Sequence, residues 1–134
     1  MASKYNALRH ASLNGHYEII KVLLKNDKNK YYINEIFVLA CINGNLKIVK
    51  YLLANGADIE TNNNSGLQWA SHKGHFKLVK YLVDNGADIN DGLGRALRWA
   101  KESGHFKIVK YLIDNGGIEF DYNSDDEDDY SDDD

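Results

Sequence analysis

Histidine is the residue type in this chain that first raises the question of metal binding. His72 and His75 lie three residues apart and offer two imidazoles at short range. Zinc needs three or four converging ligands, and no cysteine or second histidine pair accompanies these two. We therefore expect no metal site. His16, His75 and His105 instead follow three equivalent glycines, where we expect their side chains to bond the turn backbone.

Covalent catalysis has equally little support, because it needs a nucleophile, a base and an orienting group in one place. The single cysteine, Cys41, falls in a slot that suits small residues, so we expect a packed apolar thiol. The chain has no glycine-rich phosphate loop of the Walker or Rossmann type. The sequence therefore predicts a protein that is not an enzyme and holds no cofactor.

Lysines recur in two regularly spaced columns. Stacked helices lie roughly 8–10 Å apart, close to the roughly 8 Å screening length at physiological salt, so these charges repel weakly. Two interpretations stay open: a strip for phosphates or an acidic partner, and a solvated outer face, which we favour. We expect no specific nucleic acid partner. The columns are Lys21, Lys50, Lys80 and Lys110, and Lys47, Lys77 and Lys107.

An internal repeat produces these columns. Its clearest marks are Gly15, Gly44, Gly74 and Gly104, spaced 29, 30 and 30 residues apart. An alanine lies four residues before each glycine, and a large apolar residue lies seven before. A near-identical string follows the last two glycines, His75–Val83 and His105–Ile113.

Each unit reads as a helix, a tight turn and a second helix. The glycine supplies the positive φ that ends the first helix. In the second helix of the third unit, only Lys77, Lys80 and Asp84 interrupt the apolar pattern. A polar stripe this narrow indicates a helix buried on most sides. One unit cannot bury its own apolar face, so the units must stack.

The string Gly74–Asn90 resembles the second half of an ankyrin repeat. The likeness spans about residues 6–119 and implies an all-α, ankyrin-type solenoid of four short helix-turn-helix repeats. The period is about three residues below the family's usual length, which implies short hairpin loops between units. Short repeats that lack proline and are rich in Asn and Lys resemble those of giant DNA viruses, in mimivirus-like ankyrin proteins.

We expect the units to occupy residues 1–31, 32–61, 62–91 and 92–120, followed by a disordered acidic tail at 121–134. The first unit acts as the N-terminal cap. The last unit keeps an internal-type second helix, so its end needs a cover. Either Ile118–Phe120 and Tyr122 provide that cover, or apolar surface stays exposed.

The resemblance assigns partner contacts to the concave face, at the residues one and two before each turn glycine. We add the positions bordering an aromatic column that contains Trp69 and Trp99. These tryptophans are either an interface anchor or, as we favour, packing between adjacent repeats. The candidate partner-binding residues are Leu13, Asn14, Ile42, Asn43, Gln68, His72, Lys73, Arg98, Glu102 and Ser103.

The tail carries nine acidic residues and no basic one, within a chain of net charge −4. It has no apolar periodicity and cannot bury enough surface to fold. Ser124 and Ser131 each precede an acidic run, the pattern used by acidophilic kinases of the casein kinase 2 type, and are candidate phosphorylation sites.

Composition sets the remaining limits. The chain has 134 residues, enough for one small domain. Its longest apolar run, Ile36–Ile42, is far below the roughly 20 residues that cross a bilayer. With one cysteine and no apolar secretory segment, we expect an intracellular protein, cytoplasmic or nuclear, and inside the host cell if it is viral.

The leading functional hypothesis is non-catalytic binding of a protein partner, of open identity, through the concave face. Two alternatives remain: the acidic tail captures basic partners, or the tail masks the lysine columns until it is displaced or modified. We expect a monomer with no membrane contact.

Overall fold

The computed structural model describes residues 2–25 and 29–120. Within these ranges the chain forms eight helices and no strand. The expected all-α fold is therefore confirmed. The helices are α1 Ala2–Asn14, α2 Tyr17–Leu24, α3 Lys30–Asn43, α4 Leu46–Ala54, α5 Thr61–Lys73, α6 Phe76–Asp84, α7 Asp91–Glu102 and α8 Phe106–Asp114.

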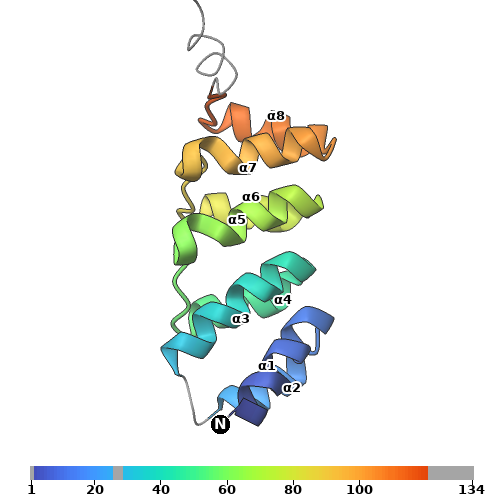
Figure 1. Ribbon diagram of the computed structural model, residues 1–134, viewed down its shortest axis with the longest axis vertical. Coiled ribbons are helices and arrows are strands. Elements are labelled where there is room, and N and C mark those ends of the chain that lie inside the picture. Colours follow the sequence, from blue (N-terminus) through green and yellow to red (C-terminus); the bar gives the residue numbers. More distant parts are fainter. Residues whose placement is uncertain (1, 26–28, 121–134) are drawn as a thin grey trace, which may run out of the picture.

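Four antiparallel helix pairs are piled along the long axis of the molecule (Figure 1). The first helices of the pairs, α1, α3, α5 and α7, pack side by side in one layer. The second helices, α2, α4, α6 and α8, form the other layer, and each packs on the first helix of its own pair. The links between successive pairs run along one side of the stack (Figure 1). This is the expected helix-turn-helix solenoid.

The first helices of the second, third and fourth units start at Lys30, Thr61 and Asp91, one or two residues before residues 32, 62 and 92. Asn29 caps the first of these helices, because its Oδ1 accepts a hydrogen bond from Tyr31 N at 2.9 Å.

Glycines close the turn inside each pair. Gly44 and Gly74 have φ values of +84° and +83°, a conformation that side chains with a Cβ disfavour. The residue after Gly74 then donates its backbone N–H to the Ala70 carbonyl at 3.0 Å, as in a Schellman ending. Ala70 is fully buried, so the small side chain lets the turn close against its helix.

The second helices supply most of the branched apolar core. Their buried faces fit the narrow polar stripe that the sequence predicts. Full burial of one such side chain contributes about 1.5–3 kcal/mol. The residues at most 1% exposed in α4 and α6 are Ile48, Val49, Leu52, Leu78, Val79 and Leu82.

Asparagine side chains hold the links between units. Asn34 Oδ1 accepts a hydrogen bond from Asp58 N at 2.8 Å, and Asn64 Oδ1 accepts one from Asp88 N at 2.9 Å. Each bond ties the returning chain to the start of the preceding first helix. The links are short, as expected, and those within the described ranges contain no strand.

Two of the first helices open with a left-handed turn. Asn62, Asn63 and Asn64 have φ values of +53°, +58° and +64°, inside the bounds of α5. The matching residues of α7, Gly92–Gly94, have φ values of +65°, +56° and +72°. Asn and Gly tolerate this conformation, which lets a short link reverse direction without a β-hairpin.

The end of the fourth unit is only partly covered. Ile118 N donates to Asn90 Oδ1 at 2.8 Å, and Lys101 forms an ion pair with Glu119 at 2.9 Å. These bonds tie residues 118 and 119 to the N-cap and to the last turn of α7. The second helix stays open, because Phe106 is 71% and Ile113 is 42% exposed. Tyr122, the remaining element of the expected cover, lies outside the described residues.

Candidate functional site

The exposed side of the first helices carries an aromatic cluster built by two adjacent units. We call this side the concave face, the name that the resemblance gives to the exposed positions of the first helices. The rings of Trp69 on α5 and Trp99 on α7 meet edge to face, with centroids 5.3 Å apart. The His72 ring lies 5.7 Å from Trp69 and 5.3 Å from Trp99. The tryptophans therefore do pack between repeats, as favoured, yet both remain half-exposed.

One hydrogen bond fixes the imidazole of this cluster. Ser103 Oγ lies 2.9 Å from His72 Nδ1, so a residue of α5 is tied to the end of α7. Both groups are half-buried. The bond holds the imidazole between the two indoles and joins the third and fourth units on this face.

Two cations flank the tryptophans. The guanidinium carbon of Arg95 lies 5.5 Å from the centre of the Trp99 ring, and Lys73 Nζ lies 6.0 Å from that of Trp69. Both side chains are exposed. Each sits four residues from its tryptophan, a spacing that makes side chains neighbours on a helix. That spacing is the signal by which sequence reasoning could have found Arg95, which it missed.

The candidates from the first two units lie on the same side, and some of them form hydrogen bonds within these two units. Leu13 is 39% exposed, and its carbonyl accepts a hydrogen bond from Asn43 Nδ2 at 2.8 Å. Asn14 is exposed and donates through Nδ2 to the His10 carbonyl at 2.8 Å. Ile42 is half-buried. These residues extend the concave face away from the aromatic cluster.

The two residues beside the aromatic column differ in accessibility. Gln68 is only 4% exposed and donates through Nε2 to the Asn63 carbonyl at 2.9 Å. Gln68 therefore stabilises the left-handed turn of its own unit. Because it is buried, we leave it out of the proposed contact surface. Arg98 is half-buried, whereas Glu102 is exposed. Ser124 and Ser131, the candidate phosphorylation sites, lie outside the described residues.

Two of the three histidines after the turn glycines, His75 and His105, bond a turn backbone, as expected, whereas His16 is exposed. His75 Nε2 lies 2.9 Å from the Ile42 carbonyl oxygen, and His105 Nε2 lies 3.0 Å from that of His72. A carbonyl only accepts, so each Nε2 is the donor. The bond reaches the turn of the preceding unit rather than its own turn. His72 and His75 thus have different partners, and within residues 2–25 and 29–120 no three potential metal ligands gather.

Cys41 is fully buried among apolar side chains, which confirms the packed thiol. Burial raises the pKa of the Cys41 thiol, because desolvation disfavours the thiolate. A thiol held in this state does not serve as a nucleophile at neutral pH.

The lysine columns lie on the second helices, on the side away from the aromatic cluster. They are solvent-exposed, as favoured, and several ammonium groups rest on aromatic rings. Lys47 and Lys21 lie 4.4 Å and 5.2 Å from the Tyr17 ring centre, and Lys107 lies 4.5 Å from that of Phe76. These ammonium groups thus make cation–π contacts on one side and remain exposed to water on the other.

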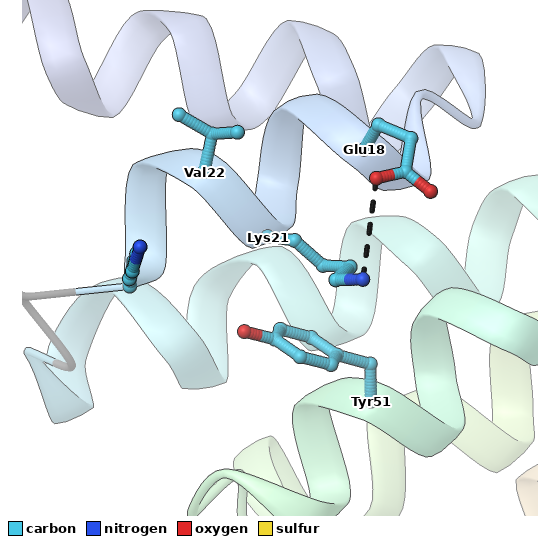
Figure 2. A pocket seen from close by; sticks show the side chains of 5 residues that line it. Glu18, Lys21, Val22 and Tyr51 are labelled. Carbon is cyan, nitrogen blue, oxygen red and sulfur yellow. Dashed lines mark ion pairs between the residues drawn. The ribbon is translucent and has the colours of Figure 1, made fainter.

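Figure 2 shows a shallow pocket at the N-terminal end of these columns, between α2 and α4. Lys21, Val22 and Tyr51 line it, and Glu18 Oε1 lies 4.0 Å from Lys21 Nζ. The pocket is open to solvent and its lysine already has a carboxylate nearby. It therefore makes a weaker ligand site than the aromatic cluster.

Residues 37–126 match the family model described as ankyrin repeats, in three copies. This match covers more than half of the chain, and the chain belongs to the ankyrin repeat family. Ankyrin repeats are in general protein–protein interaction modules. No helix in the described part of the chain has the length and apolar character needed to cross a membrane.

Two viral proteins are similar to the chain. It is 40% identical over 65 residues to the ankyrin repeat protein R837 of Acanthamoeba polyphaga mimivirus, a match covering 48% of the chain and 10% of that protein. It is 35% identical over 77 residues to the ankyrin repeat protein R844 of the same virus, covering 49% of the chain and 36% of that protein. The chain thus spans a small part of the relatives' length, and the resemblance to giant-virus repeats is confirmed.

Proposed function

We propose that the chain is a non-catalytic module that binds a partner protein through its concave face. The observation that carries this proposal is the half-exposed pair Trp69 and Trp99, flanked by Lys73 and Arg95. Tryptophan and arginine dominate the energetic centres of protein interfaces, because they bury large areas at little cost in side-chain entropy.

The cluster is also preorganised. His72 is wedged between the indoles and bonded to Ser103, so the rings are held in one arrangement before any partner arrives. Binding to a preorganised surface avoids much of the ordering cost of association. We place the remaining contacts at Leu13, Asn14, Ile42, Asn43, Glu102 and Ser103 along the same face.

The arrangement of the polar residues favours binding over catalysis. The turn histidines are used to join units, and the cysteine is buried with its thiol protonated. Polar side chains therefore lie in separate columns, whereas acyl or phosphoryl transfer needs them to converge. We propose an intracellular location on the strength of the single buried thiol.

The proposal is tested by affinity capture from a eukaryotic cell lysate at about physiological salt. The bait is the full chain, and the test variant is Trp69→Ala with Trp99→Ala. The matched control, Lys77→Ala with Lys80→Ala, removes two exposed side chains from the second-helix layer. We expect a discrete partner that the control retains and the tryptophan variant loses.

Both variants need circular dichroism and thermal melts that match the wild type. If Trp69→Ala with Trp99→Ala unfolds the stack, Lys73→Ala with Arg95→Ala replaces it, because both side chains are exposed. A partner retained by every concave-face variant and lost with the lysine control overturns the proposal.

A further inference from the structure

Two cations of the concave face, Lys73 and Arg95, lie beside its tryptophans. Neither forms an ion pair with a carboxylate of residues 2–25 or 29–120. Asp91, the acid nearest to Arg95 in sequence, uses its carboxylate to accept hydrogen bonds from Asn64 Nδ2 and Gly92 N. The exposed acids Asp88 and Glu102 are each seven residues from Arg95. A pair of tryptophans between two unpaired cations fits a peptide that carries both carboxylates and an aromatic or apolar side chain.

A segment of that chemistry starts beside this face. Phe120 lies against Gly94, because a methyl group on Gly94 would meet its ring at 2.9 Å. Arg95 is the next residue of α7. One residue earlier, Glu119 already forms an ion pair with Lys101. The acidic residues 121–134 therefore begin at the start of the helix that carries Arg95 and Trp99.

The segment is long enough to reach both tryptophans. Fourteen residues span about 20 Å even as a flexible coil, and mutual repulsion of the acids extends them further. Trp99 is only about one helical turn beyond Arg95, and adjacent first helices lie about 8–10 Å apart. The segment thus reaches Lys73 on α5 without being fully extended.

The chemistry of the segment matches the face. It has nine acidic residues for the two cations, and Tyr122 and Tyr130 for the indoles. A tethered segment acts at an effective concentration of about 1 mM, so an intrinsic dissociation constant of about 1 mM fills the face half of the time. No single ordered conformation of the segment is needed for that occupancy.

The lysine columns compete less well for the segment. Lys110 lies on α8, the last helix before the segment, and forms an ion pair with Asp114 at 2.9 Å. The Phe76 ring in that layer is already covered by Tyr111 and Lys107. The exposed aromatic ring of that layer is Phe106 on α8, whereas the concave face presents two indoles with a cation over each.

We infer that residues 121–134 bind intramolecularly to the Trp69–Trp99 face, between Lys73 and Arg95, and occupy the surface that the partner uses. The inference rests on the proposed function, because it assigns a regulator to the same face. It also gives the partner a chemistry: the partner presents an acidic peptide that displaces this segment.

The two tryptophans of the chain both lie in this face, so their fluorescence reports on it directly. In the full chain, we compare the wild type with a neutral-tail variant, in which all nine acids of residues 121–134 are replaced by their amides: Asp121→Asn, Asp125→Asn, Asp126→Asn, Glu127→Gln, Asp128→Asn, Asp129→Asn, Asp132→Asn, Asp133→Asn and Asp134→Asn. We expect the neutral-tail variant in low salt to show the red-shifted emission that the wild type reaches only in about 1 M NaCl.

The probe for binding in trans is a synthetic peptide of residues 121–134, titrated into the neutral-tail variant. We expect it to restore the wild-type emission, and we expect Lys73→Ala with Arg95→Ala to weaken its binding about tenfold. Lys77→Ala with Lys80→Ala is the matched control and leaves the affinity within about twofold.

Three results overturn the inference: emission that salt and tail neutralisation leave unchanged, peptide binding that depends on Lys77 and Lys80, and a tail effect that grows with protein concentration. The second places the segment on the lysine columns, and the third places it on another copy. None of these experiments uses the partner. A negative result would therefore overturn this inference without overturning the proposal that the concave face binds a partner protein.

Discussion

The imidazole of His75 reaches across the repeat boundary to the turn of the preceding unit, where its Nε2 lies 2.9 Å from the Ile42 carbonyl oxygen. The same ring fills the space above Gly44, because a methyl group there would lie 2.5 Å from Nδ1. The histidine after one turn and the glycine of the previous turn therefore form one joint. His105 and Gly74 repeat it one unit later.

Removing this joint should weaken the stack. For His75→Ala we expect a loss of about 1 kcal/mol in the free energy of unfolding, because the Ile42 carbonyl loses its donor in a half-buried position. His16→Ala is the control, because His16 is exposed and its ring lies beside His10 of its own unit; its effect should stay within about 0.5 kcal/mol. Urea denaturation followed by far-UV circular dichroism measures both. Equal effects would contradict the joint.

The turn glycines should differ in their tolerance of alanine. Gly74→Ala and Gly104→Ala both force a side chain to a positive φ, of +83° and +78°, which costs about 1–2 kcal/mol. At Gly74 the new methyl group would also meet His105 at 2.6 Å, whereas at Gly104 nothing lies within 4 Å. We therefore expect Gly74→Ala to be the more destabilising by at least about 1 kcal/mol.

A double-mutant cycle checks the cause. In a His105→Ala background the steric penalty disappears, and the two glycine substitutions should have equal cost. A difference that persists without the imidazole would assign it to the turn backbone rather than to the joint.

Leu93 offers a stabilising substitution. It has a φ of +56° and is 58% exposed, while the equivalent position of the third unit holds Asn63 at +58°. Leu93→Asn should therefore raise the free energy of unfolding by about 1 kcal/mol, because Asn adopts this conformation at lower cost. The reciprocal change, Asn63→Leu, should lower it by a similar amount. Chemical denaturation of both variants gives the answer, and a destabilising Leu93→Asn would contradict the left-handed turn.

Cys41 should be chemically silent in the folded protein. Burial raises the pKa of its thiol, so the thiolate that reacts with an aromatic disulfide reagent is scarce and inaccessible at pH 8. We expect no labelling of the native chain over minutes and complete labelling in 6 M guanidinium chloride. Labelling of the native chain at the rate of a free thiol would show that the first-helix layer opens readily.

The repeat made most of the fold predictable. Four glycines in register defined the turns, and the apolar pattern of residues 75–83 defined a buried helix without any alignment. The left-handed openings of α5 and α7 were not predictable by the same means. Their sequences, Asn62–Asn64 and Gly92–Gly94, have no residue in common. Apart from Leu93 they consist of residues that tolerate positive φ, and such residues also occur in ordinary loops.

The candidate site was predicted less evenly. Positions before the turn glycines lie on the exposed side, as the repeat register requires. Gln68 is buried because it donates a hydrogen bond to the left-handed turn of α5. The spacing of the repeats does not predict that turn, so it could not predict the burial of Gln68. Lys101 was informative and overlooked: the equivalent slots hold the fully buried Ser12, Cys41 and Ser71. In the fourth unit the lysine in that slot is exposed and forms an ion pair with Glu119.

The central claim is that the concave face is the binding surface, and side-chain footprinting by hydroxyl radicals tests it most directly. Oxidation of each side chain is compared in the neutral-tail variant alone and bound to the captured partner, with the exposed Phe106 on α8 as the internal control. The account predicts strong protection of Trp69 and Trp99 with Phe106 unchanged. Protection of Phe106 while both tryptophans oxidise at the free rate would contradict it.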